Sequence, residues 1–152
     1  MDKNKAVYKL KGIPPIYCIN LDDKQDRWKY MEEQFKYWEI ENYTRISAYD
    51  GRDGRDLGDI LKGRYPDGMS SGEVGCTTSH LRAMVEFLKT DAPCALMMED
   101  DCDISTATHW PFTWKDFYAK VPYDYDVIQL AIINPASVHL RMHKRFVNDF
   151  ST

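Results

Sequence analysis

The chain has 152 residues, of which 43% are hydrophobic and 29% are charged, and its formal net charge is -4. This length is typical of one domain with a sizeable core, so we interpret residues 1–152 as a single domain. The negative charge does not favour binding to nucleic acid or to a membrane surface. No apolar run approaches the roughly 20 residues that a transmembrane helix needs, and the polar N-terminus is not followed by a signal-peptide core.

The four cysteines are Cys18, Cys76, Cys94 and Cys102. None belongs to a Cys-x-x-Cys pair, so their spacing carries no zinc or thioredoxin signature. Most fall in or beside expected strands and helices, which indicates reduced thiols and a cytoplasmic location, although an even number leaves disulfides open. Cys76 and His80 lie four residues apart and would make half of a zinc site. No partner pair is visible, so we do not expect zinc.

The first half of the chain predicts two strands and one helix. Residues 16–21 form a β-rich run after two prolines, and residues 43–48 form a second one. Asp22 and Asp23 follow the first strand and are expected to cap a helix. The apolar residues of that helix recur at helical spacing and are Trp28, Met31, Phe35 and Trp38.

Residues 49–71 are rich in Gly, Asp and Arg and predict a long loop, with at most one turn of helix around residues 57–61. Ser70 and Glu73 have the spacing of a capping box, which begins a helix to about Lys89. Its expected apolar stripe consists of Val74, Leu81, Met84, Val85 and Leu88.

The second half continues the alternation of strands and helices. A strand is expected at residues 95–98, a short helix at 114–121 and a last strand at 125–131. Alternating strands and helices favour an α/β fold with a mostly parallel sheet that is covered on both faces.

The strand at residues 95–98 ends in a cluster of acids, Glu99, Asp100, Asp101 and Asp103. Like charges packed together repel one another, and a divalent cation such as Mg²⁺ or Mn²⁺, held with substrate phosphates, would offset that repulsion. An extended backbone would direct Glu99, Asp101 and Asp103 to one side and Asp100 to the other. The Asp-x-Asp unit from Asp101 to Asp103 therefore predicts a metal site, and a solvated acidic turn remains the alternative.

Other acids follow the earlier strands, namely Asp22, Asp23 and Asp50. Ligands of parallel sheets bind outside the carboxyl ends of the strands, so we expect all these acids on one edge. An aspartyl phosphatase would need a different acid spacing after the first strand, and a receiver domain would need a lysine after a late strand. The chain also has no Gly-x-Gly-x-x-Gly and no Walker lysine loop.

Three blocks of sequence lie in the order and spacing of one known family. They are residues 16–22 with Asp26 and Arg27 shortly after, residues 45–51, and residues 72–81 followed by residues 96–101. Over residues 14–131 they resemble glycosyltransferase family 25, the lipooligosaccharide and procollagen galactosyltransferase family. The resemblance implies a GT-A fold, which is Rossmann-like with a mostly parallel sheet.

The same resemblance implies a chemistry. The expected donor is a UDP-sugar, UDP-galactose or UDP-glucose, and the expected cofactor is Mn²⁺ or Mg²⁺. The sugar would be transferred with inversion to a glycan, lipid-linked or protein acceptor, while a carboxylate base takes the acceptor proton and the metal supports the leaving UDP.

By the resemblance, the donor-binding residues are Asn20, Asp22, Arg27, Asp50, Ser79, His80 and Glu99. Asp100 and Asp101 are the catalytic candidates, and Asp101 and Asp103 are the metal candidates, with Asp103 an acid that the family often lacks. Ordinary roles stay open for several of them: a turn for Asn20 and Asp50, a helix cap for Asp22, a salt bridge for Arg27, and burial for Ser79 and His80.

Family domains normally continue beyond the point where this sequence stops, so we expect a C-terminally incomplete fold. A truncated, non-catalytic remnant that binds a UDP-sugar or a partner protein is therefore an alternative to a transferase, and a metal-dependent phosphohydrolase is a third, less favoured one. An uncovered sheet edge would also promote self-association.

Overall fold

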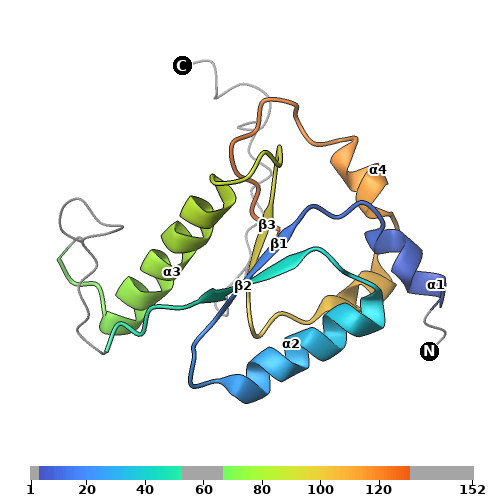
Figure 1. Ribbon diagram of the computed structural model, residues 1–152. Helices are drawn as coiled ribbons and strands as arrows, with labels where there is room; N and C mark the ends of the chain where they lie inside the picture. Colours follow the sequence, from blue (N-terminus) through green and yellow to red (C-terminus); the bar gives the residue numbers. More distant parts are fainter. Residues whose placement is uncertain (1–3, 53–66, 131–152) are drawn as a thin grey trace. The chain divides into compact units, whose positions relative to one another are not determined.

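The structure is a computed structural model that describes residues 4–52 and 67–130. The chain divides into two compact units, Met1–Lys115 and Asp116–Thr152. The first unit contains a three-stranded sheet of β1 (Ile16–Asn20), β2 (Tyr43–Ser47) and β3 (Leu96–Glu99). All three strands are parallel, in the order β2-β1-β3 (Figure 1). The expected α/β fold with a parallel sheet is therefore confirmed, as are the first three predicted strands.

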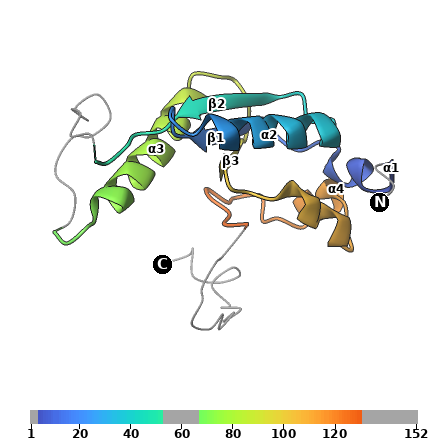
Figure 2. The same ribbon diagram turned by 90° about the horizontal axis from the view of Figure 1, so that it is seen from below.

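Helices cover both faces of this sheet. On one face Ile16 and Cys18 pack with α2 (Gln25–Trp38), whose residues Met31 and Phe35 are fully buried. On the other face Tyr17 and Ile19 belong to a second core that includes Ala83 of α3 (Ser71–Phe87). Figures 1 and 2 show α2 and α3 beside the strands. The alternation along β1 follows from the period of two in an extended chain, which sends successive side chains to opposite faces.

The start of α2 differs from the expectation. Lys24 occupies the N-cap position and makes no capping hydrogen bond with its side chain. Asp22 does not cap the helix, because its carboxylate accepts hydrogen bonds from Arg45 and Ser47 of the neighbouring strand β2. The prediction that Asp22 and Asp23 cap this helix is therefore wrong: the strand partners of Asp22 compete successfully for its oxygens.

The predicted capping box of α3 is confirmed, because Ser70 accepts from Glu73 N and Glu73 accepts from Ser70 N. The predicted apolar stripe is not. Val85 is 42% exposed and Leu88 is 75% exposed, whereas the buried positions are Gly75, Thr78, Ser79 and Ala83. A Cβ atom at Gly75 would lie 2.7 Å from Tyr49 O, so the helix approaches the chain after β2 too closely for large side chains.

Three short helices were not expected: α1 (Asn4–Val7), η1 (Tyr8–Leu10) and η2 (Ile104–His109), the last two of the 3₁₀ type. Lys9 joins η1 to η2 and the residue after it, since its Nζ donates to Thr108 O at 2.8 Å and to Trp110 O at 2.6 Å. Within the described residues no helix has the length and hydrophobicity that a membrane crossing requires.

The last part of the chain departs most from the sequence expectation. The short helix α4 spans Trp114–Tyr118, shorter than the expected 114–121. Residues 125–130 form no strand, so the predicted last strand is wrong over its described part, and Val127 is 78% exposed. A β-rich run becomes a strand only where a neighbouring strand pairs with it, and residues 116–130 supply none. The expected helical turn at 57–61 lies outside the described residues.

Candidate functional site

A polar network lies at the carboxyl edge of the sheet, and Asn20 is its centre. Asn20 ends β1 and is only 1% exposed. Its Nδ2 donates to Asp100 Oδ2 at 2.6 Å and to Lys24 O at 3.0 Å. Its Oδ1 accepts from Arg45 Nη2 at 2.7 Å and from Arg45 Nε at 2.9 Å. All the hydrogen-bonding groups of this buried amide are thus used, and they join the end of β1 to β2 and to the residue after β3.

The acidic segment turns rather than staying extended. β3 ends at Glu99, and Cys102 N donates back to Glu99 O at 3.3 Å. This turn directs Asp100 inward, where Asn20 and Arg27 bind its two oxygens, with Arg27 Nη1 donating to Oδ1 at 3.0 Å. The hydrogen bond to Asp100 raises the pKa of Arg27. The extended backbone considered for the residues after Met98 is not found, because the turn lets the Asp100 carboxylate bind both Asn20 and Arg27.

Arg45 of β2 is a site residue that the sequence reasoning missed. Its guanidinium lies between Asn20 and Asp22, donating from Nη2 to Asp22 Oδ1 at 2.8 Å, and stacks over the Trp28 ring at 5.6 Å. Ser47, two residues further along β2, donates to the other oxygen of Asp22 at 2.7 Å. The register of β2 against β1 places Ser47 opposite Asn20. Period-two alternation in β2 was the available signal, since Arg45 and Ser47 share one face.

Gln34 is a second missed residue, and it holds the segment after the acidic turn. This α2 side chain is buried, and its Nε2 donates to Cys102 O at 2.9 Å while its Oε1 accepts from Ile104 N at 2.8 Å. One amide therefore satisfies two backbone groups, as a strand partner would. Asp103 lies between those two groups, so Gln34 fixes the backbone on both sides of it.

Cys76, His80 and Glu99 gather beside this network. His80 Nε2 lies 3.2 Å from Glu99 Oε1, and the Cys76 thiol donates to the same oxygen at 3.6 Å. The contact with His80 lowers the pKa of Glu99, while burial and the nearby Glu99 charge raise the pKa of Cys76. The structure thus pairs His80 with Glu99, both predicted to bind the donor, and adds Cys76 to them.

The two metal candidates are placed differently. Asp101 is exposed, and among the described residues its side chain makes no hydrogen bond or ion pair. Asp103 precedes η2 and accepts from Ser105 N at 2.9 Å. Hydrogen bonds from the side chain and the backbone of Ser105 lower the pKa of Asp103. Oxygen ligands of this kind suit Mg²⁺ or Mn²⁺. Asp101 has the open carboxylate that a metal ligand needs, and Asp103 also caps a helix.

Two other residues that were predicted to bind the sugar donor, Asp50 and Ser79, make hydrogen bonds to nearby parts of the chain. Asp50 accepts from the backbone N of Arg52 at 3.0 Å and from its Nε at 2.7 Å. Ser79 is buried, donates to Gly75 O at 2.6 Å and accepts from Tyr49 N at 2.8 Å. Ser79 therefore joins α3 to the chain after β2.

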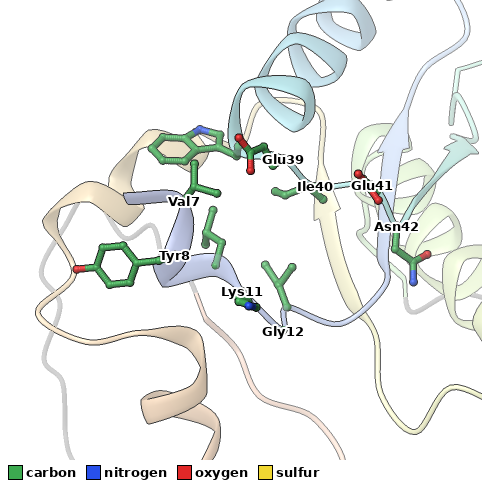
Figure 3. Close-up of a pocket in the computed structure, with 11 residues that line it drawn as sticks. Val7, Tyr8, Lys11, Gly12, Glu39, Ile40, Glu41 and Asn42 are labelled. Carbon is green, nitrogen blue, oxygen red and sulfur yellow. The ribbon is translucent and has the colours of Figure 1, made fainter. Parts of the chain in front are cut away.

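A hollow of about 440 Å³ lies elsewhere in the first unit. Figure 3 shows its walls, which come from the N-terminal helices and from the end of α2 with the residues after it. Its residues precede β1 and β2, so it lies at the amino ends of the strands. The polar network is at the opposite, carboxyl end, where parallel sheets bind ligands, so we do not assign the hollow a part in the site.

Comparison with known protein families gave a match over most of the chain. Residues 13–130 match the family model described as Glycosyltransferase family 25 (LPS biosynthesis protein). Searches of curated proteins and of solved structures gave no match. The matched range contains the whole sheet, the polar network and the acidic turn.

Proposed function

The chain belongs to glycosyltransferase family 25, and we propose that it transfers a hexose, galactose or glucose, from a UDP-sugar with inversion. Membership of this family makes it a glycosyltransferase with a role in lipopolysaccharide biosynthesis. The proposed acceptor is a hydroxyl of a glycan or a lipid-linked sugar. The observation that carries the proposal is the network that joins Asn20, Arg27 and Asp100 at the carboxyl edge of the sheet.

Arg27 is the residue best suited to a diphosphate. Its side chain is 52% exposed, and Nη1 alone is used for Asp100. A guanidinium carries five donors in a fixed fork that matches phosphate oxygens. Because Asp100 fixes one nitrogen of the guanidinium, the remaining N–H groups of Arg27 are held at the carboxyl edge of the sheet, where the nucleotide would bind. We assign Asp100 an orienting role, since both of its oxygens accept hydrogen bonds from Asn20 and Arg27.

Asp101 is the proposed metal ligand, with Asp103 as the second. The exposed carboxylate of Asp101 follows Asp100, whose side chain is fixed by hydrogen bonds. The turn therefore holds one carboxylate that is free to bind a metal ion. A bound Mn²⁺ or Mg²⁺ would neutralise the negative charge that develops on the departing diphosphate. Asn20 and Gln34 serve the site indirectly. Asn20 holds the side-chain carboxylate of Asp100, and Gln34 holds the backbone of the segment after the acidic turn.

The cytoplasm is the proposed location. Three cysteines are free thiols: Cys18 is buried, Cys76 is exposed, and Cys102 is intermediate. Unpaired cysteines are usual in a reducing compartment, where disulfides rarely persist.

The direct test is sugar transfer by the purified chain. UDP-galactose and UDP-glucose are supplied separately, with and without Mn²⁺, together with a deacylated lipopolysaccharide acceptor, and released UDP is measured. We expect Mn²⁺-dependent release from one donor, a product of inverted anomeric configuration by NMR, and loss of release in Asp101→Asn. Asp91→Asn, an exposed acid before β3, is the matched control. Metal-independent release, or a product that retains the donor configuration, would contradict the proposal.

A further inference from the structure

We propose that Cys76, His80 and Glu99 form a Zn²⁺ site beside the acidic turn. This site goes beyond the proposed donor chemistry, which needs a hard cation on carboxylate oxygens. In the part of the chain that the structure describes, these three residues are the only group of three or more potential metal ligands whose ligand atoms converge, all within 4.8 Å of one another.

The secondary structure explains why these residues meet. Cys76 and His80 are four residues apart on α3, so their side chains lie one above the other on one face of the helix. Glu99 is the last residue of β3 and extends from the sheet toward that face. Two ligands from a regular helix and one from a strand end are thus held by rigid elements rather than by loops.

The distances fit a single tetrahedral ion. Ligand bonds of about 2.3 Å to sulfur, about 2.0 Å to nitrogen and about 2.1 Å to oxygen place sulfur and oxygen about 3.6 Å apart, and nitrogen and oxygen about 3.4 Å apart. Cys76 Sγ lies 3.6 Å from Glu99 Oε1, and His80 Nε2 lies 3.2 Å from that same oxygen. Two of the three separations among the ligand atoms are therefore already close to those that a shared ion requires, and the third, between Cys76 and His80, is within 4.8 Å.

The chemical types of the three ligands favour Zn²⁺ over Mg²⁺ or Mn²⁺. A thiolate and an imidazole suit Zn²⁺, whereas Mg²⁺ and Mn²⁺ prefer oxygen ligands such as Asp101 and Asp103. Three protein ligands leave a fourth position for water or substrate, which is the pattern of an open zinc site. The partial exposure of His80 and Glu99 makes this position accessible from solvent. On this assignment, His80 and Glu99 bind zinc rather than the nucleotide directly.

The test measures Zn²⁺ binding to the full, untagged chain by competition with a chromophoric chelator. We expect one ion per chain, and Mn²⁺ should not displace it. Because loss of a residue that only supports a ligand already weakens metal binding about 10–100-fold, Cys76→Ser and His80→Gln should each weaken it by at least about tenfold. Cys94→Ser and His109→Gln are matched controls and should bind Zn²⁺ like the parent. Glu99→Gln keeps the size of the side chain and should also weaken binding.

Cobalt substitution gives a readout that does not depend on the variants folding. Co²⁺ bound to the parent chain should show a thiolate charge-transfer band and the visible bands of a tetrahedral ion, and Zn²⁺ should abolish both. No stoichiometric Zn²⁺ binding, no thiolate band, or unchanged binding in Cys76→Ser would overturn the proposal. Because no sugar nucleotide enters this test, its result is separate from that of the donor proposal.

Discussion

At the scale of single residues, the neighbours Asp100 and Asp101 have opposite environments. Asp100 is buried and accepts hydrogen bonds from Asn20 and Arg27, whereas Asp101 is exposed without such contacts among the described residues. A buried carboxylate that accepts hydrogen bonds contributes to stability, and a solvent-facing one is available to a ligand. Substitution of each by asparagine should separate these two roles.

Asp100→Asn should lower the free energy of unfolding by about 2 kcal/mol, because one oxygen acceptor is replaced by an amide that faces another donor. Asp101→Asn should change it by less than about 0.5 kcal/mol, as is usual for exposed positions. Urea unfolding followed by circular dichroism measures both. Equal losses in the two variants would show that Asp100 is not the buried anchor of the turn.

The Glu99 carboxylate should make stability depend on pH. Contact with His80 lowers its folded pKa below the ordinary value of 4.5. A depressed carboxyl pKa contributes stability above the unfolded value, and this contribution is lost as the pH falls from 4.5 through the folded pKa. Because Glu99 is half exposed, the effect should stay below about 1 kcal/mol.

The measurement compares the parent with Glu99→Gln by urea unfolding in a chelating buffer, from neutral pH to below 4.5. The parent should be more stable at neutral pH, and the difference should shrink over the acid range. Glu41→Gln, an exposed control, should not reproduce this trend. A difference that grows toward acid pH would contradict the pairing of Glu99 with His80.

At the scale of elements, α2 controls the acidic segment through Gln34. Gln34→Met keeps the approximate size but leaves Cys102 O and Ile104 N without their partner. We expect a loss of about 2–4 kcal/mol, because each unsatisfied buried group costs about 1–3 kcal/mol. Amide exchange at residues 102–104 should also accelerate. Gln25→Met, an exposed glutamine on the same helix, should show neither effect.

Helices and strands were predicted from the sequence more successfully than the contacts that they make. Three strands and the capping box of α3 followed from local patterns, because propensity and capping depend on neighbouring residues. The buried face of α3 did not follow from a local pattern. Gly75 approaches Tyr49 closely, so small residues are buried on this helix while Leu88 and Val85 stay exposed. The last strand failed because strand pairing is a long-range property.

The same distinction applies to the site. The clustering of strand-end residues at one edge was predictable from the parallel topology, and Asn20, Arg27 and Asp100 do meet there. The partnership of Gln34 with Cys102 joins residues 68 positions apart in the chain. No local pattern encodes such a pair, so it required the folded structure.

At the scale of the whole molecule, the outer strands of the described sheet predict self-association. β2 and β3 each pair with β1 on one side only, and unpaired strand edges template contacts between chains. The sedimentation coefficient should rise with protein concentration. Thr44→Lys places a charge on the exposed edge strand β2 and should weaken the association, whereas Thr90→Lys should not. A coefficient independent of concentration would contradict this prediction.

The central claim is that the carboxyl edge of the sheet binds a nucleoside diphosphate together with a divalent metal on Asp101. Calorimetric titration of UDP into the chain, with and without Mn²⁺, tests it most directly. We expect binding that requires Mn²⁺ and that weakens by at least about tenfold in Asp101→Asn, with Asp91→Asn binding like the parent. UDP binding that is equally tight without Mn²⁺, or unchanged in Asp101→Asn, would contradict the claim.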